Sequence, residues 1–238
     1  SGANAGIEAL AVQPDGKLLI AGSFTQFRGV GRSRIARLDS DGSVDPSFDP
    51  GTGPNNPLHA IALQTDGKII IGGDFWLVGE QPHLYLTRLN PDGTVDTSFA
   101  ASLQLTVLHY PKAICSVAIA PDGKVLIGGT FTNINGFPRR GIGRLNADGS
   151  LDTSFDPGTG LNLPQDMEFC SLAVQPDGKT VVVGPFWSIN GVAHHGITRL
   201  NINGSVDLTF NPGSGLAGYG SPTSARATPK RSRLGTAP

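Results

Sequence analysis

The sequence has few cysteines, little charge and no long apolar run. Two cysteines among 238 residues are too few for a small disulfide scaffold, and they neither require nor exclude an oxidising compartment. Charged residues make up 16% and the net charge is -1, so we expect no surface for nucleic acid. No segment approaches the roughly 18 apolar residues of a spanning helix, and no charged and apolar leader opens the chain. We therefore expect neither nucleic acid nor membrane as a partner.

Glycine and proline are abundant, and one segment recurs. The 33 glycines and 18 prolines indicate many turns and little helix, which favours an all-β fold. The recurring segment is a short apolar run, a turn with Asp-Gly, and a second run rich in Ile, Val and Leu, a pattern typical of a β-hairpin. Its four copies are IEALAVQPDGKLLIAG from Ile7, LHAIALQTDGKIIIGG from Leu58, ICSVAIAPDGKVLIGG from Ile114 and FCSLAVQPDGKTVVVG from Phe169.

Each repeat continues beyond its hairpin. A loop leads to a third apolar run that ends in Arg-Leu, and a second tight turn then leads to a fourth short run. Four antiparallel strands, repeated, are the plan of a β-propeller blade. Solenoids are the main competing architecture, but parallel β-helix coils are shorter and leucine-rich repeats need their own asparagine ladder. We predict a β-propeller with four blades, at about residues 6–56, 57–112, 113–166 and 167–220.

The two ends of the chain differ from the repeats. Residues 1–6 match the connection between repeats, as though the chain were cut from a longer array. Residues 221–238 form a basic tail outside the propeller domain of residues 1–220, and they are either foreign sequence or a segment that docks on a partner. Copies one and three resemble each other, as do copies two and four. This fits either a closed four-bladed ring or a homodimer that forms an eight-bladed ring.

The repeats resemble the delta-60 repeat family, propeller-type repeats of bacterial exported and surface proteins. The resemblance rests on LAVQPDGK, IARL, DGS and DTSFDPG, which recur in fixed order from Gly6 to about Gly215. It implies a propeller and an extracellular or cell-surface location, and it implies no settled activity. Function must therefore be sought in what differs between the copies.

One column of the inner strand changes its chemistry from copy to copy. Seven residues before each turn aspartate stand Glu8, His59, Cys115 and Cys170, and these cysteines are the only two in the chain. Inner strands surround the axis of a propeller, so the four side chains are expected at one height around it. Thiolate, imidazole and carboxylate are zinc ligands. The alternatives are a disulfide between Cys115 and Cys170, or two buried thiols with an unrelated Glu and His.

The zinc interpretation predicts a hydrolase. His59, Cys115 and Cys170 would hold the metal and leave a fourth position for water, whose pKa a catalytic zinc lowers to about 7. Glu8 would be the general base, with an ester or phosphoester as the small-molecule substrate. If Glu8 is also a ligand, the site is closed and structural.

The loop between the second and third strands suggests a different function. Copies two and four have a tryptophan where the others have threonine, and a histidine where the others have arginine. In a propeller these loops share a face with the connections between blades, where ligand sites usually lie. The tryptophans either pack between blades, which is the commoner role of this residue, or stack a glycan or another flat ligand. The second role would make the chain a binding module without catalysis, and the family resemblance implies that such a module is secreted or on the cell surface. The candidate residues are Trp76, Trp187, His83 and His194.

The turns themselves have simple interpretations. The second turn, Asp39 to Asp45 and its equivalents, is rich in oxygen ligands but lacks the terminal glutamate of a high-affinity calcium loop, so we interpret it as a plain hairpin turn. The lysine of each first turn is interpreted as a solvated residue. These four lysines are Lys17, Lys68, Lys124 and Lys179.

Overall fold

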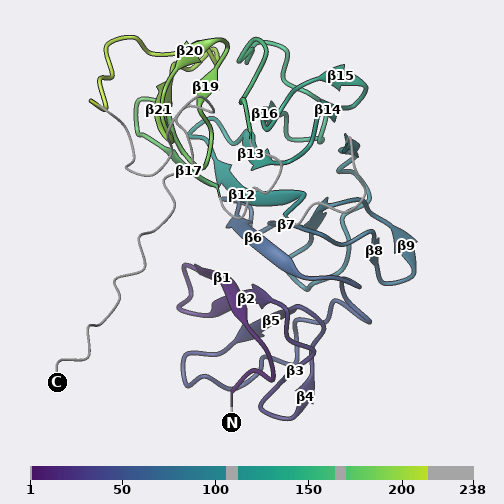
Figure 1. The fold of residues 1–238 in the computed structure, drawn as a ribbon. Coiled ribbons are helices and arrows are strands. Elements are labelled where there is room, and N and C mark those ends of the chain that lie inside the picture. The colour runs from purple at the N-terminus through teal and green to yellow at the C-terminus, as the bar shows by residue number, and fades with distance from the viewer. Residues whose placement is uncertain (1, 106–111, 164–169, 214–238) are drawn as a thin grey trace, which may run out of the picture.

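The computed structural model describes residues 2–105, 112–163 and 170–213, and in them each repeat forms one blade with a main sheet of three antiparallel strands (Figure 1). The strands, from the inner to the outer edge, are β1 (Ile7–Val12), β2 (Leu18–Gly22) and β5 (Ile35–Leu38) in blade 1; β6 (Leu58–Leu63), β7 (Ile69–Gly73) and β10 (Leu86–Leu89) in blade 2; β12 (Ile114–Ile119), β13 (Val125–Gly129) and β16 (Ile142–Leu145) in blade 3; and β17 (Ser171–Val174), β18 (Thr180–Val183) and β21 (Ile197–Leu200) in blade 4.

The first turn of each blade is built as the sequence predicts. In blade 1, Gly16 has a φ of 84°, which glycine adopts without strain, and the Lys17 N–H donates to Asp15 Oδ1. The Gln13 N–H closes the turn by donating to the Lys17 carbonyl. The predicted all-β fold is confirmed, and the described residues contain no helix that could cross a membrane.

The fourth strand of each blade is reduced to a single bridge. In blade 1 only Val44 pairs, opposite Leu38, and the chain then leaves the sheet. The reason is the next residue, Asp45, whose carboxylate turns into the blade to meet Arg37 and Lys17. The equivalent bridges are Leu89 with Val95, Leu145 with Leu151 and Leu200 with Val206.

A small hairpin extends the connection between the second and third strands of every blade. It lies beside the connection between blades, since Pro54 bridges to Val78 and Leu161 bridges to Ile189. The prediction that these loops share a face with the connections is therefore confirmed. The hairpin strands are β3 (Gln26–Phe27), β4 (Val30–Gly31), β8 (Leu77–Val78), β9 (Gln81–Pro82), β14 (Asn133–Ile134), β15 (Phe137–Pro138), β19 (Ser188–Ile189) and β20 (Val192–Ala193), and β11 (Leu103–Gln104) pairs with β14.

The blades follow one another around an arc, with β1, β6, β12 and β17 as the inner strands (Figure 1). Each inner strand packs on the next, but β1 and β17, at the two ends of the arc, do not pack together in the described part of the chain. The four described blades therefore do not close into a ring of four. The tail predicted for residues 221–238 lies outside the described residues.

The apolar core lies between neighbouring blades. Phe48, Phe99 and Phe155 are at most 5% exposed and each packs on the following blade. Blades approach so closely that a Cβ added to Gly72 would lie 2.3 Å from Cγ2 of Ile114 in the next blade. Burial of this kind contributes about 25 cal/mol for each Å² of apolar surface removed from water.

A buried ionic network accompanies that core in every blade. In blade 2, Asp96 Oδ2 accepts from Arg88 Nε and from Lys68 Nζ, each at 2.7 Å, and the Arg88 guanidinium lies 4.9 Å from the ring centroid of Phe99. Burial alone would raise the pKa of Asp96, but its hydrogen bonds to Lys68, Ser98 and Arg88 hold that pKa well below the usual range. The prediction that the turn lysines are merely solvated is therefore wrong.

Candidate functional site

The column that differs between copies lies at a bulge in the inner strands. The register between the first two strands shifts at Glu8 in blade 1, at His59 in blade 2 and at Cys115 in blade 3. A bulge redirects the side chain of its extra residue. In this propeller it directs the column side chains along the ring toward the neighbouring blade.

Glu8 and His59 form an ion pair across the boundary between blades 1 and 2. His59 Nδ1 lies 2.7 Å from Glu8 Oε2, and His59 Nε2 lies 2.8 Å from Asp74 Oδ2. The other oxygen of Glu8 accepts a hydrogen bond from Ser23 Oγ at 3.0 Å, and the other oxygen of Asp74 accepts from the Ala113 N–H at 2.8 Å. The imidazole is thus held between two carboxylates.

This arrangement favours the charged form of His59. Its side chain is only 9% exposed, and burial alone would lower the pKa. The hydrogen bonds to Asp74 and Glu8 outweigh burial, so the pKa of His59 is raised above its ordinary value. A histidine in this state is an imidazolium that donates from both nitrogens, so it is a poor metal ligand and a poor base.

Cys115 and Cys170 form a disulfide between blades 3 and 4, with their Cα atoms 5.6 Å apart. The four column residues therefore resolve into two neighbouring pairs, Glu8 with His59 and Cys115 with Cys170. These residues do not fit the predicted zinc site, because the two sulfurs are bonded to each other and both nitrogens of His59 face carboxylates. The described residues contain no group of three or more His, Cys, Asp or Glu side chains placed to hold a metal ion.

Asp74 is the member of this cluster that sequence reasoning missed. It follows β7 directly, in the column occupied by Ser23, Thr130 and Pro185 in the other copies. That column varies as strongly as the predicted one, and Ser23 and Asp74 both contact a column residue from the end of a second strand. The signal was present, but it lay in a loop where variation is the rule.

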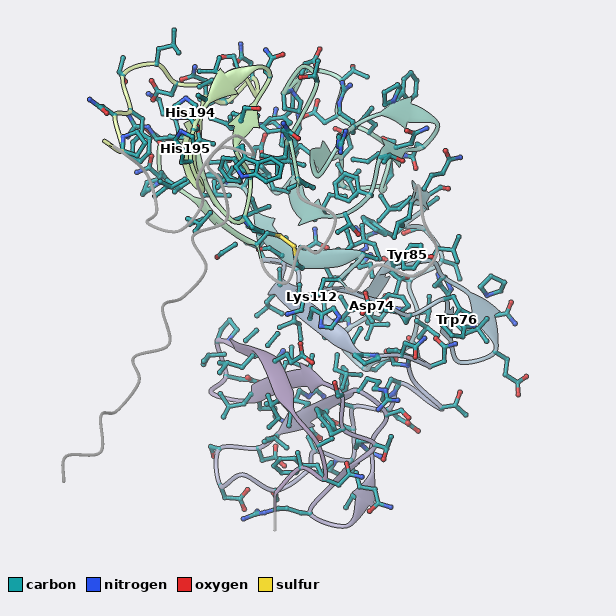
Figure 2. The ribbon with its side chains drawn as sticks, in the orientation of Figure 1. Asp74, Trp76, Tyr85, Lys112, His194 and His195 are labelled. Atoms are coloured by element: carbon teal, nitrogen blue, oxygen red, sulfur yellow. A yellow bond between two sulfur atoms is a disulfide. The ribbon has the colours of Figure 1, made fainter. Side chains whose placement is uncertain are left out.

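The loop-face candidates of blade 2 lie on one hairpin. The Trp76 side chain is exposed, at 52%, while its backbone N–H and that of Leu77 both donate to Asn55 Oδ1. The His83 N–H donates to the Trp76 carbonyl, and His83 Nδ1 lies 3.2 Å from Thr87 Oγ1. Burial lowers the pKa of His83. Trp76 is therefore an exposed residue whose backbone is fixed by Asn55, and it lies on the hairpin side of blade 2 (Figure 2).

The candidates of blade 4 do not join this group. Trp187 is half-buried, and His194 is buried with no hydrogen-bond partner for Nε2 in the described part of the chain. Burial, and after it the neighbouring His195, lowers the pKa of His194. Figure 2 shows His194 and Trp76 at widely separated places on the arc. The four residues therefore do not form one site, and only Trp76 has the exposure that a stacking ligand needs.

The second turns have the plain form that the sequence predicts. Asp41 Oδ1 accepts from the N–H and the hydroxyl of Ser43, and an asparagine, Asn203, makes the same contacts with Ser205 in blade 4. In both turns the side-chain Oδ1 is engaged by internal donors, as expected for turn residues.

Comparison with known families supports this description. Four segments, at residues 13–48, 64–99, 120–155 and 175–210, match the domain of unknown function (DUF5122) beta-propeller. The chain belongs to this family. The predicted bacterial propeller-repeat family is thereby confirmed, and the repeat count agrees with the four blades. Comparison with curated proteins finds no match.

Solved structures with a similar fold are distant in sequence. A gluconolactonase from Xanthomonas campestris is 18% identical with a TM-score of 0.50, and the alignment covers 84% of this chain and 60% of that one. Virginiamycin B lyase from Staphylococcus aureus is 15% identical with a TM-score of 0.46, covering 86% and 56%. The extracellular domain of a one-component system protein from B. thetaiotaomicron is 16% identical with a TM-score of 0.47, covering 82% and 22%. The chain thus spans at most 60% of these proteins, and the likeness concerns the fold alone.

Proposed function

We propose that this propeller is a binding module that recognises a glycan on the loop face of blade 2. The observation that carries the proposal is the 52% exposure of Trp76 on a backbone held by Asn55. Large aromatic side chains normally bury most of their surface. An indole that faces solvent from a fixed backbone is available to stack on the apolar face of a sugar ring.

The loop that carries Trp76 combines exposed apolar residues with polar ones. Leu84 is 44% exposed and follows His83, which is bonded to the Trp76 carbonyl across the hairpin. Polar side chains stand in the same loop, with Glu80 at the tip of the hairpin and Gln81 and His83 after it. Apolar side chains with a few polar groups among them are the usual composition of a small-molecule site.

A location outside the cytoplasm belongs to the same proposal. The disulfide between Cys115 and Cys170 is stable in oxidising compartments and is rare in the reducing cytosol. Together with the resemblance to repeats of exported proteins, it supports an extracellular or cell-surface module.

A glycan array followed by calorimetry tests the binding proposal. We expect Trp76→Ala to weaken binding of any glycan hit by about fivefold or more, since loss of an aromatic stacking contact costs about 1 to 3 kcal/mol. Phe137→Ala is the matched control, because Phe137 is equally exposed, at 54%, on the corresponding hairpin of blade 3. Absence of any glycan hit, or equal losses in the two variants, would count against the proposal.

Hydrolysis at the inner rim is the second candidate, and the cluster of Glu8, His59 and Asp74 favours it. The Glu8 side chain is 32% exposed, so its carboxylate could take a proton from water as that water adds to an ester carbonyl. Turnover of activated esters that disappears in Glu8→Gln and survives in Cys115→Ser with Cys170→Ser would support this function. Turnover that is absent, or unchanged in Glu8→Gln, would exclude Glu8 as its base.

A further inference from the structure

The two ends of the arc carry the two halves of the interface that joins neighbouring blades. We name the face of a blade that packs on the preceding blade its incoming face, and the face that packs on the following blade its outgoing face. On the incoming face of blade 1, Ile7 and Leu10 are 47% and 65% exposed. Of the counterparts of Ile7, Leu58 and Ile114 are 0% exposed. Of the counterparts of Leu10, Leu172 is 8% exposed, and Ile61 and Val117 are half-buried.

The outgoing face of blade 4 is uncovered in the same way. Phe210 is partly exposed, whereas the three phenylalanines at its position are at most 5% exposed. Three more apolar residues of this face are also partly exposed in blade 4, while their counterparts are buried in blades 1 to 3. These residues are Val181, Val183 and Ile197.

The arginine hydrogen bond that joins neighbouring blades is also missing, among the described residues, at the end of blade 4. The arginine of each blade donates to a carbonyl in the second turn of the following blade: Arg37 to Pro91, Arg88 to Ala147 and Arg144 to Ile202. Within the described part of the chain, the corresponding Arg199 donates only to residues of blade 4, Asp207 and Thr209. Its side chain is 23% exposed, against 10%, 6% and 5% in blades 1, 2 and 3.

The missing partner of Arg199 can be named by equivalence. Pro91, Ala147 and Ile202 occupy the turn position that Ser40 occupies in blade 1. A second bond follows the same rule, because the N–H of Asp49, Ala100 and Asp156 donates to the turn carbonyl of Asp92, Asp148 and Asn203. The equivalent donor in blade 4 is the Asn211 N–H, and the equivalent acceptor in blade 1 is the Asp41 carbonyl.

We propose that a second copy of this chain covers both ends and closes an eight-bladed ring. The outgoing face of each blade 4 would pack on the incoming face of blade 1 in the other copy, giving two identical junctions about a twofold axis. A head-to-tail contact closes into a ring when its rotation allows, and otherwise continues as a filament. Propellers typically have four to eight blades, so two copies reach the upper end of that range and three copies exceed it.

The proposal predicts specific contacts. Arg199 donates to the Ser40 carbonyl of the second copy, and Val183 lies against Leu10 of the second copy. The latter follows from blades 3 and 4, where a Cβ at Gly128 would lie 3.3 Å from Leu172 Cδ1. Val183 is larger than its counterparts Ala21, Gly72 and Gly128. The junction between the two copies is therefore wider near the end of β18 than the junctions between blades of one chain are at the same position.

Light scattering coupled to size-exclusion chromatography tests the ring. We expect the wild-type protein to have the mass of two chains at every concentration above the dissociation constant of the dimer. Leu10→Lys and Val183→Asp should each raise that constant at least about tenfold, as loss of a central apolar contact does. The double variant should recover most of the association, because the new charges face each other at both junctions.

Phe137→Lys is the matched control for the variants at Leu10. Phe137 is similarly exposed but lies on the hairpin of an interior blade, so this variant should remain a dimer. Circular dichroism confirms folding, which Leu10 affects little because it is exposed in the single chain. A wild-type monomer, masses that grow beyond the dimer with concentration, or a dimer that Phe137→Lys dissociates while Leu10→Lys does not would each overturn the proposal.

Discussion

His59 Nδ1 lies 2.7 Å from Glu8 Oε2, and this contact joins the inner strands of blades 1 and 2. With Asp74 on the other nitrogen, the pKa of His59 is raised above its ordinary value despite its burial. The ion pair stabilises the fold only while the imidazole is protonated. Stability that depends on this pair is therefore linked to pH.

We predict that the protein loses stability as the pH rises above neutral. For a histidine whose pKa is higher in the folded state, the stabilisation is fully present below its unfolded pKa of about 6.5 and is lost as pH rises through the folded pKa. Melting temperatures should therefore fall on the alkaline side of about pH 6.5. The measurement is a series of thermal melts from acidic to alkaline buffers.

His59→Gln provides the control for this pH dependence. Glutamine keeps a polar side chain but has no titrating group. The melting temperature of this variant should therefore fall less on the alkaline side, and it should no longer be higher at acidic pH. Glu8→Gln should give a smaller change, because Asp74 remains bound to Nε2. An unaltered slope in His59→Gln would show that another group governs the pH dependence.

The disulfide gives a second prediction, concerning stability. Cys115 and Cys170 are 55 residues apart, and a closed loop of that size contributes about 4 kcal/mol in the chain-entropy description. Reductant should therefore lower the melting temperature of the wild-type protein by roughly 10 °C. It should leave the variant with both cysteines changed to serine unaffected, and equal responses of the two proteins would contradict a bonded pair.

Elemental analysis separates the disulfide from the zinc site predicted from sequence. We expect oxidised protein to purify without stoichiometric zinc, because thiolates and not disulfide sulfurs bind this metal. Zinc in a one-to-one ratio that is lost in Cys115→Ser would restore the metal interpretation. Titration of free thiols in the same sample shows which state is present.

The fold was predictable from sequence because its signals repeat four times. Asp-Gly turns, apolar runs and the Arg-Leu ending of the third strand fix the order of strands in each blade. The shortened fourth strand was not predictable, since it depends on Asp45 turning inward to Arg37 and Lys17. That network also explains why the turn lysine was misjudged as solvated.

The candidate site was predictable only in part. The column from Glu8 to Cys170 could be recognised because its side-chain chemistry changes between copies. Equivalent positions around the propeller axis could not show, however, that each residue pairs with its immediate neighbour. That outcome depends on the bulges, which direct Glu8 toward His59 and Cys115 toward Cys170. Among the loop candidates, solvent exposure distinguishes Trp76 from the buried His194, and the sequence alone does not give that exposure.

The buried ionic network supplies the last prediction. In blade 2, Asp96→Asn removes the charge that pairs with both Arg88 and Lys68, and the Arg88 side chain is only 6% exposed. An arginine left without its buried partner typically costs 3 to 5 kcal/mol of unfolding free energy. Urea unfolding of the variant measures this loss directly. The control is Asp92→Asn, in an exposed turn of the same blade, where the amide oxygen can still accept from Thr94 as Asn203 does from Ser205 in blade 4. It should cost less than about 0.5 kcal/mol. If both variants lose the same free energy, the network contributes no more than a surface turn, and the constant Arg, Asp and Lys positions of the repeats need a different explanation.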